Sequence, residues 1–348
     1  MASRLTDYLT AAREAGAAEL QLSAGSVPWV RVEGHLKRLP ESELSREEAD
    51  ALAQELAQAA DVEPANDIDF SVSMENLGRF RVNLHHHADG TGLSLKCVPQ
   101  ELPSLEALGL PESLEELTWY RTGMVLATGP TGCGKSSTLA ALLQRINRSR
   151  REHVITIEDP IEFVFPNDQC NVTQREVGRH TKSFPNALRA ALREDPDVIL
   201  VSELRDLDAI RTAIIAAETG HLVLATLHTR DAASTVNRII DVFPPNEQEQ
   251  IRTMVSASLR TVICQQLLPR PEGGRRAPAY EIMHVSPAIA NLIRDGKSHL
   301  IPGQLQLGRK LGMVDLDTRL RQMVDEGLID LETARAHAVA PQRFGGTA

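Results

Sequence analysis

The sequence predicts an α/β protein built from two domains. The 348 residues exceed the size at which a single hydrophobic core usually stops growing. Three prolines between Pro99 and Pro111 indicate a linker, because proline fixes φ and has no N–H to donate to a sheet. Before the linker, strands dominate; after it, strand-like and helix-like segments alternate, which indicates a parallel sheet. The predicted parts are an α+β domain at 1–98, a linker at 99–120, an α/β core at 121–270 and a mainly helical region at 271–348.

The first domain is predicted to contain two helices and six strands. Ser45 and Glu48 form a capping-box pattern at the start of an Ala/Leu/Gln-rich segment, which predicts a helix to about Ala59. Asp89-Gly90 is a turn signal between the last two strands. The other predicted elements are a helix at 4–15 and strands at 19–24, 27–33, 35–39, 67–73, 79–87 and 92–98.

The second domain is predicted from short apolar runs separated by helical segments. The runs at 124–128, 153–157, 198–201 and 221–227 read as strands of a parallel sheet. After Ala279 the chain is predicted to be mainly helical, at 287–294, 316–326 and 330–338. The Gly- and Arg-rich segment Pro271–Pro278 is predicted to be a surface loop.

Composition disfavours several functional classes. A net charge of −10 and 3% aromatic residues argue against a nucleic-acid binder, which usually has a basic surface and stacking platforms. The four cysteines are scattered without a C-x-x-C pair, which argues against a zinc or redox motif and favours a reducing cytoplasm. No run approaches the roughly 20 apolar residues of a membrane span, so we expect no direct membrane insertion and a partner for any membrane contact.

The pattern G-x-x-x-x-G-K-[ST] occurs between a predicted strand and a predicted helix. In such loops the backbone N–H groups surround phosphates at a helix N-terminus. Lys135 is expected to neutralise the β- and γ-phosphates, and Ser136 to offer its hydroxyl to Mg²⁺. A flexible glycine turn is the alternative, and the flanking strand and helix disfavour it. The residues expected to contact the nucleotide here are Gly129, Pro130, Thr131, Gly132, Cys133, Gly134, Lys135, Ser136 and Ser137.

Two acidic clusters follow predicted strands and are candidates to orient water and anchor Mg²⁺. The first contains Glu158, Asp159 and Glu162, and the second ends at Glu203. Ligands of open α/β sheets bind at the carboxyl ends of the strands, where both clusters are expected. Each cluster alone could be a helix cap or a solvated turn, but two of them behind a phosphate-binding loop favour catalysis.

Histidines at both ends of one predicted strand are harder to interpret. His221 and His228 are seven residues apart and are therefore expected on opposite faces of an extended strand. A structural role is the ordinary expectation for each. The run 85–87 of three histidines alternates between faces, has no nearby cysteine or carboxylate pair, and is predicted to be structural or surface-exposed.

Four segments together resemble the secretion ATPase superfamily of the GspE/PilB/PilT type, and most closely the retraction ATPases of type IV pili. GPTGCGKSSTLAAL resembles the Walker A motif of that family, TIEDPIEF its Asp box, LREDPDVILVSELRD its Walker B motif, and TGHLVLATLHTRDAASTVNRIIDVFP its His box. The stretch PAIANLIRD resembles the AIRNLIRE stretch of the retraction ATPases. The missing C-x-x-C pairs distinguish the chain from pilus-assembly relatives that bind zinc.

This resemblance implies a fold, cofactors and partners. It implies a PAS-like N-terminal α+β domain, then a RecA-like P-loop NTPase domain with a helical C-terminal region. It implies ATP and Mg²⁺ as cofactors and a homohexameric ring in the cytoplasm. The ring would dock on a PilC-like platform protein of the inner membrane, with a PilU-like accessory ATPase as a further partner and no nucleic acid. The implied function is a motor that couples ATP hydrolysis to pilus retraction and twitching motility.

The resemblance also implies roles for individual residues. Glu162 matches the carboxylate that activates water, Glu203 the Walker B carboxylate that holds Mg²⁺, and His228 the γ-phosphate sensor; the two glutamates could exchange roles. Arg81 matches an arginine that reaches the triphosphate, and the second such arginine falls at Lys96, which keeps the charge without the bidentate fork. The chain departs from the family pattern at Cys133, Ser202, Leu204 and Ala290.

Other functions stay open at this point. Within the family, the alternatives are a pilus-extension or type II secretion ATPase and a PilU-like accessory subunit. Outside it, the chain could be a regulatory ring component with poor turnover, or a nucleic-acid translocase. Cys133, at a helix N-terminus, is expected to have a lowered thiol pKa and to make the site sensitive to oxidation.

Overall fold

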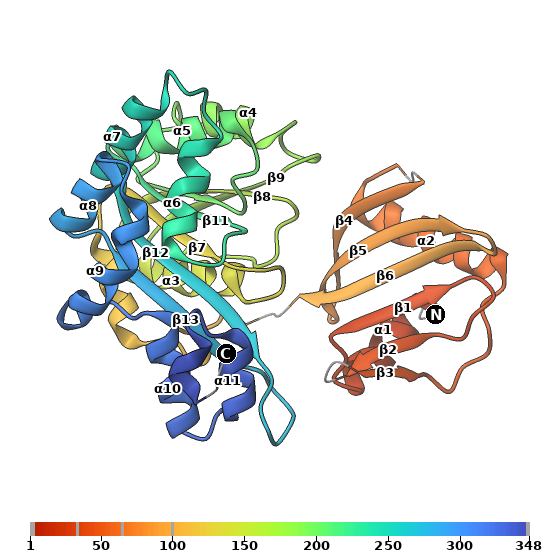
Figure 1. The fold of residues 1–348 in the computed structure, drawn as a ribbon. Helices are drawn as coiled ribbons and strands as arrows, with labels where there is room; N and C mark the ends of the chain where they lie inside the picture. The colour runs from red at the N-terminus through yellow and green to blue at the C-terminus, as the bar shows by residue number, and fades with distance from the viewer. Residues whose placement is uncertain (1–3, 33–34, 64–65, 99–100, 346–348) are drawn as a thin grey trace. The chain divides into compact units, whose positions relative to one another are not determined.

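The computed structural model describes residues 4–32, 35–63, 66–98 and 101–345, and these fall into two compact units. Unit 1 comprises Met1–Glu101 and the short segment Pro160–Val164. Unit 2 comprises Leu102–Asp159 and Phe165–Ala348 (Figure 1). Parts of the predictions lie outside the described residues: Glu33 at the end of a predicted strand, positions 1–3, 34 and 64–65 of the predicted first domain, positions 99–100 of the predicted linker, and positions 346–348.

Unit 1 is an antiparallel sheet with two helices. The sheet has the strand order β3-β2-β1-β6-β5-β4, and every adjacent pair is antiparallel. All the helices and strands predicted for this part are present. They are α1 Arg4–Glu14, β1 Glu19–Ser23, β2 Trp29–Val32, β3 His35–Arg38, α2 Arg46–Ala60, β4 Asp67–Met74, β5 Gly78–His87 and β6 Gly90–Val98.

One face of this sheet packs against the helices, and the other carries charged residues. The predicted capping box of α2 is confirmed, because Ser45 accepts the N–H of Glu48 while the Glu48 carboxylate accepts the N–H of Ser45. Phe80 and Val82 of β5 are buried in the core with the apolar faces of α1 and α2. Since side chains alternate along a strand, Arg81 lies on the opposite face of the sheet.

Unit 2 is a seven-stranded sheet with helices packed on it. The strand order is β13-β12-β7-β11-β10-β8-β9, and all neighbouring pairs are parallel except β12 with β13. The predicted α/β fold with a parallel sheet is confirmed. The strands are β7 Gly123–Thr128, β8 His153–Glu158, β9 Asn171–Glu176, β10 Val198–Val201, β11 Leu222–Leu227, β12 Leu259–Leu268 and β13 Ala277–His284.

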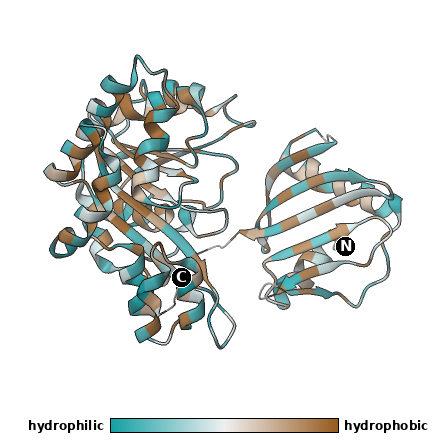
Figure 2. Cartoon of the chain, viewed as in Figure 1, coloured by the Kyte–Doolittle hydropathy of each residue, from teal (hydrophilic) through white to brown (hydrophobic). Residues whose placement is uncertain are grey.

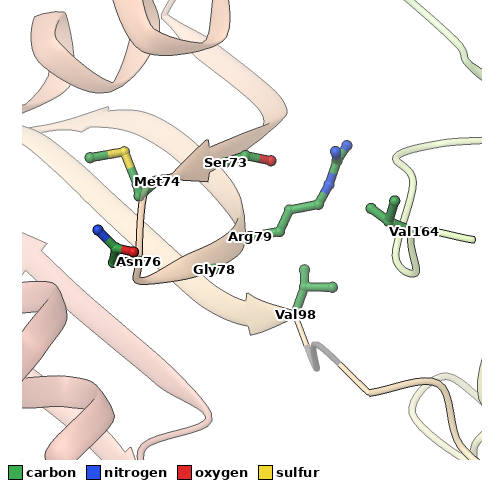
Figure 3. A pocket seen from close by; sticks show the side chains of 7 residues that line it. All are labelled: Ser73, Met74, Asn76, Gly78, Arg79, Val98 and Val164. Atoms are coloured by element: carbon green, nitrogen blue, oxygen red, sulfur yellow. The ribbon is translucent and has the colours of Figure 1, made fainter. Parts of the chain in front are cut away.

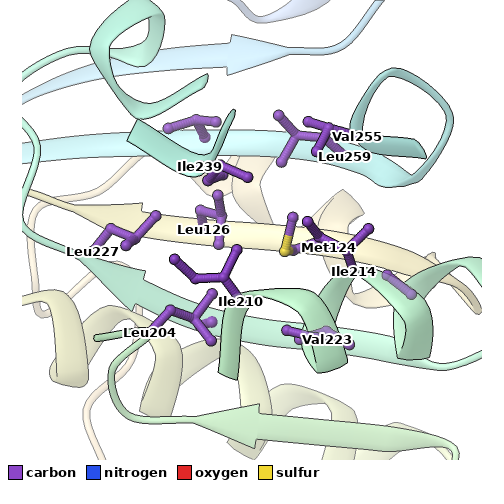
Figure 4. Close-up of a cluster of buried hydrophobic side chains, with 14 of the residues drawn as sticks. Met124, Leu126, Leu204, Ile210, Ile214, Val223, Leu227, Ile239, Val255 and Leu259 are labelled. Carbon is purple, nitrogen blue, oxygen red and sulfur yellow. The ribbon is translucent and has the colours of Figure 1, made fainter. Parts of the chain in front are cut away.

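The helices of unit 2 cover both faces of this sheet. Met124 and Leu126 of β7 pack with α5 and α7 in one large core (Figure 4), whereas α3 contacts β7 and β11 from the other face. Figure 2 shows hydrophobic residues concentrated along the central strands, as expected for parallel strands buried on both sides. These helices are α3 Lys135–Ser149, α4 Phe184–Ala191, α5 Leu207–Glu218, α6 Ala232–Asp241 and α7 Gln248–Ser258.

The C-terminal region differs from the prediction at its start. The boundary expected at residue 271 falls in the turn of the β12–β13 hairpin, and β13 begins inside the predicted loop Pro271–Pro278. The strands β9, β12 and β13 were not predicted. Helices follow only after His284: α8 Pro287–Arg294, α9 Ile301–Leu307, α10 Leu316–Asp325 and α11 Leu331–His337.

Short 3-10 segments complete the chain: η1 Glu112–Trp119, η2 Ser298–Leu300, η3 Gly308–Leu311 and η4 Pro341–Phe344. The last of these joins α10 and α11 in a small core on the β12–β13 hairpin, in which Phe344 packs near Leu268 and Leu320. Within the described residues, no helix has the length and apolar character to cross a membrane.

Candidate active site

The predicted phosphate-binding loop connects β7 to α3 in unit 2. Helix α3 begins at Lys135, and its N-cap is Gly134 with φ 97°. Because this cap has no side chain, none accepts the first amides of α3, and they remain directed at the space where a phosphate would bind. The Nζ atom of Lys135 donates to the carbonyl oxygens of Gly129 (2.9 Å) and Pro130 (3.0 Å). The lysine is thereby held inside the loop.

The first glycine of the loop is required by close packing. Gly129 has φ 138°, a region that is essentially restricted to glycine. A Cβ atom at this position would lie 2.2 Å from the carbonyl oxygen of Gln265 in β12 and 2.7 Å from Sγ of Cys133. The neighbouring strand therefore fixes the start of the loop, and only glycine allows this approach.

The expectation for Cys133 is wrong. Its side chain is buried, and burial raises the pKa of the thiol, although the nearby charge of Lys135 acts in the opposite direction. The sequence correctly places Cys133 beside a helix N-terminus, but the cost of burying a thiolate outweighs the favourable charges. The thiol is therefore protonated at neutral pH, and the oxidation-sensitive site predicted from the sequence is not supported.

The carboxyl ends of four neighbouring strands bring the other predicted groups together. In the order β7-β11-β10-β8, these ends carry the phosphate-binding loop, His228, Glu203 and Asp159. The Nε2 atom of His228 lies 3.4 Å from Oε1 of Glu203. Arg205 donates from Nε to Oε2 of Glu203 at 2.9 Å and from an Nη atom to Oδ2 of Asp159 at 3.3 Å. His228, Glu203, Arg205 and Asp159 therefore form one row of polar side chains across the ends of three strands.

Arg205 was not among the predicted site residues. The hydrogen bond to Glu203 raises the pKa of its guanidinium, which is charged in any case. It follows Glu203 by two residues, so both side chains leave the same short turn after β10, and this spacing was a usable signal. A second arginine was also missed: Arg276 donates to the carbonyl oxygen of Gly132 at 3.4 Å from the β12–β13 hairpin.

Two predicted residues have partners away from this row. Glu158 ends β8 with a buried carboxylate, whose Oε1 accepts from Thr156 (2.6 Å) and from Gln174 (3.0 Å). His221 lies before the other end of β11, where its Nδ1 contacts the carbonyl oxygen of Ala216 at 2.9 Å. These contacts are of a structural kind for both side chains.

A second group of predicted residues lies in unit 1. Arg81 of β5 and Lys96 of β6 are directly opposite each other in the antiparallel register, so their side chains share the helix-free face of the sheet. The guanidinium of Arg81 lies 3.7 Å from the carboxylate of Glu162, which belongs to the segment Pro160–Val164 of the same unit. Arg81 therefore has Lys96 as its neighbour across the strands and Glu162 as its ion-pair partner from a distant part of the sequence.

A pocket lies next to this cluster on unit 1. It is lined by Ser73, Met74, Asn76, Gly78, Arg79, Val98 and Val164, and Figure 3 shows Arg79 and Val164 extending toward the same space. Arg79 pairs with Val98 as Arg81 pairs with Lys96, so the pocket continues the same sheet face. None of the predicted site residues lines it.

The arrangement in unit 2 can bind and polarise a nucleoside triphosphate. Lys135 and the first turn of α3 offer positive charge, and Ser136 and Glu203 are oxygen donors of the type that Mg²⁺ prefers. His228 lies between the phosphate-binding loop and Glu203 in the strand order. A parallel α/β sheet with this loop and these strand-end groups defines the class of P-loop nucleoside triphosphatases.

Comparison with known proteins narrows this class. The model of the Type II/IV secretion system protein family matches residues 63–288, and the chain belongs to this family. It is 45% identical over 343 residues to the type IV pilus retraction ATPase PilT of Pseudomonas aeruginosa, covering 98% of this chain and 99% of the relative. It is 37% identical over 328 residues to the type IV pilus ATPase PilU of the same organism, covering 93% and 86%.

A solved structure agrees with this assignment. The crystal structure of the pilus retraction motor PilT with bound ADP superimposes with a TM-score of 0.89 at 42% sequence identity and covers 99% of both chains. The similarity therefore extends over both units and is not confined to the phosphate-binding loop.

Proposed function

We propose that this chain is the subunit of a motor ATPase that couples ATP hydrolysis to retraction of type IV pili. The observation that carries the proposal is the row of Asp159, Glu203 and His228 beside the loop of Lys135, in a chain that matches PilT over nearly its full length. The similarity to a crystal structure with bound ADP supports a nucleotide in this loop.

The chemistry of ATP hydrolysis is divided between residues of unit 2 and Glu162 of unit 1. Lys135 holds the terminal phosphates, and Ser136 with Glu203 holds Mg²⁺, which neutralises charge on the phosphate oxygens. His228 senses the γ-phosphate through the same carboxylate that it contacts in this structure. The water is activated by Glu162, and an exchange of roles between Glu162 and Glu203 is the alternative assignment.

Unit 1 supplies additional positive charge to the nucleotide. Arg81 is the proposed contact to the triphosphate and Lys96 the second, and both lie on the helix-free face of the sheet. In this scheme the ion pair between Arg81 and Glu162 joins the residue proposed to contact the triphosphate to the residue proposed to activate the water. The subunits form a homohexameric ring in the cytoplasm, which reaches the inner membrane through a PilC-like platform protein.

A second candidate is an accessory subunit of the PilU type, which works with a separate retraction motor. The observation that favours it is Lys96, since a lysine replaces the arginine of the family pattern and cannot form a bidentate contact to phosphate. The 37% identity to PilU supports the same candidate.

Two experiments test the proposed function. Purified protein is expected to hydrolyse ATP, and Lys135→Ala is expected to abolish turnover; absence of turnover in the unmodified protein would contradict the motor assignment. In a piliated host, deletion of the gene is expected to give excess pili and loss of twitching, restored by the unmodified gene and not by Lys135→Ala. Loss of pili on deletion would instead indicate an extension ATPase. Normal twitching on deletion, with an ATPase-active protein, would favour the accessory role.

A further inference from the structure

A buried carboxyl group on β13 joins the starts of two helices. Glu281 lies in the middle of the strand and is 7% exposed. Its Oε1 accepts the N–H of Ala232 at 2.8 Å, and its carboxylate also accepts the N–H of Leu316. Ala232 and Leu316 are the first residues of α6 and α10. The positive ends of two helix dipoles therefore meet at one side chain, which favours its ionised form.

The two helices lead to different parts of unit 2. Helix α6 begins four residues after His228, so its start fixes the short segment that carries this histidine. Helix α10 belongs to the C-terminal helices, where Leu316 and Leu320 pack on the β12–β13 hairpin. Glu281 therefore connects the histidine segment to the C-terminal helices through a single strand.

The surroundings of Glu281 oppose its ionisation. Burial raises the pKa of this carboxyl group to about 7; the charges of Asp231 and Asp315 also raise it, while the two amide hydrogen bonds act against the rise. Asp231 and Asp315 are the N-caps of α6 and α10. The charge of Glu281 therefore changes in the physiological pH range.

Two further kinds of group face this site. Cys264 is directly opposite Glu281 in the β12–β13 register, and burial raises the pKa of its thiol well above the ordinary value, so it stays neutral. Arg309 and Arg343 approach Asp315 from outside, at 3.8 and 4.0 Å. Their positive charges offset part of the negative charge of Asp315. The groups that stabilise the ionised form of Glu281 directly are the two helix amides.

We infer that Glu281 is a positioning residue for ATP turnover: its ionised carboxylate holds the start of α6, and with it His228, in place beside Glu203. The inference rests on the role proposed above for His228. Protonation removes the negative charge that the two helix N-termini stabilise and places an O–H donor on a group that faces backbone N–H donors, so the carboxyl group becomes a weaker acceptor for them. Turnover is therefore expected to depend on this distant carboxyl group, although Glu281 itself does not contact the nucleotide.

The first test compares Glu281→Gln with the unmodified protein over a range of pH. The ratio of the two kcat values cancels every titration that they share. At about pH 6, where Glu281 is mostly protonated, the ratio is expected to be near one. At about pH 8 it is expected to fall by about 10-fold, within the range that misplacement of a reacting group costs. KM and the Kd for ADP are expected to stay unchanged, because the phosphate-binding loop is intact.

The second test removes the donor instead of the acceptor. Ala232→Pro removes the N–H that Glu281 accepts, at the first helical position, where proline is well tolerated, and Asp231 before it is already extended. It is expected to lower kcat at about pH 8 as Glu281→Gln does, and the double variant is expected to be no worse than either single variant. This variant also keeps the inference testable if Glu281→Gln does not fold.

Asp330→Asn is the matched control, since Asp330 caps α11 through the N–H of Thr333 and has no bond to β13 among the described contacts. Its kcat ratio to the unmodified protein is expected to be flat with pH. A flat ratio for Glu281→Gln, or additive effects of the two variants, would overturn the inference and leave the proposed function intact. Absence of ATP hydrolysis in the unmodified protein would instead overturn the proposed function.

Discussion

The imidazole of His228 and the carboxylate of Glu203 face each other at the ends of adjacent parallel strands, with Nε2 3.4 Å from Oε1. This contact allows the histidine to report on the same carboxylate that is proposed to hold Mg²⁺. If the two act as a unit, their removal should not be additive.

Glu203→Gln and His228→Asn are each expected to lower kcat by about 100-fold, the middle of the range for a positioned catalytic group. The double variant is expected to be little worse than Glu203→Gln alone. Single-turnover hydrolysis of ATP by all four proteins gives the coupling energy. Binding of ADP serves as the control, because Lys135 is unchanged. Fully multiplicative losses would show that the contact has no role in turnover.

Arg205 is expected to matter for turnover and little for stability. Its guanidinium reaches Glu203 and Asp159 at once, whereas a lysine offers a single ammonium group without this fork geometry. Arg205→Lys and Arg205→Ala should therefore lower kcat to a similar extent. The side chain is 54% exposed, and exposed ion pairs contribute little to stability. Thermal unfolding should be unchanged, and full activity of Arg205→Lys would contradict this assignment.

The sequence predicted the parts of the fold that have strong local patterns. Central strands such as β7 and β11 are uninterrupted apolar runs, and the phosphate-binding loop has a fixed spacing. Strand β12 was missed because α7 runs directly into it at Leu259, without glycine or proline to mark the boundary. Strand β9 was missed because its sequence NVTQRE is polar, as an edge strand can be.

The site was predictable only where residues belong to a compact motif. Glu203 and His228 could be expected at neighbouring strand ends, because parallel strands end at one edge of the sheet. Glu281 has no such signal: it becomes a shared helix acceptor only through the pairing of β12 with β13 and the arrival of α6 and α10. The burial of Cys133, which reverses its expected pKa shift, also depends on tertiary packing.

Gly129→Ala is expected to destabilise the protein and to abolish nucleotide binding. The added Cβ would lie 2.2 Å from the backbone of Gln265, which cannot move without disturbing β12. Gly274→Ala is the matched control, since it also has positive φ (74°) but nothing within 4 Å of the added carbon. Urea unfolding should show a loss for Gly129→Ala about 2 kcal/mol larger than for the control. Equal losses would show that the approach of β12 is not a constraint.

Cys133 is expected to be unreactive at neutral pH. Burial raises the pKa of its thiol, and only the thiolate is a strong nucleophile. Treatment with iodoacetamide or peroxide at neutral pH should therefore leave ATP hydrolysis unchanged, and Cys133→Ser should have similar activity. Mass spectrometry of the treated protein locates any modified cysteine. Rapid inactivation that Cys133→Ser prevents would restore the expectation drawn from the sequence.

Glu281 is expected to make the folded protein less stable as the pH rises. Its pKa is about 7 in the folded chain, above the ordinary value of 4.5, so the folded state binds more protons than the unfolded state between these values. The contribution of Glu281 to the stability of the folded protein is fully present below about pH 4.5 and is lost as the pH rises through about 7. The total is roughly 3 kcal/mol, since each pKa unit corresponds to about 1.4 kcal/mol.

Glu281→Gln removes this titration, so its free energy of unfolding should depend less on pH between about pH 5 and pH 8 than that of the unmodified protein. Urea unfolding at several pH values measures the difference. A carboxyl group with a purely structural role would lose stability and activity together when replaced. At about pH 8, Glu281→Gln is expected to be more stable relative to the unmodified protein than at lower pH, and yet to turn over more slowly. Both effects have one cause, because the negative charge of Glu281 destabilises the fold but holds the start of α6. Parallel stability curves would show that the pKa of Glu281 is not raised in the folded chain.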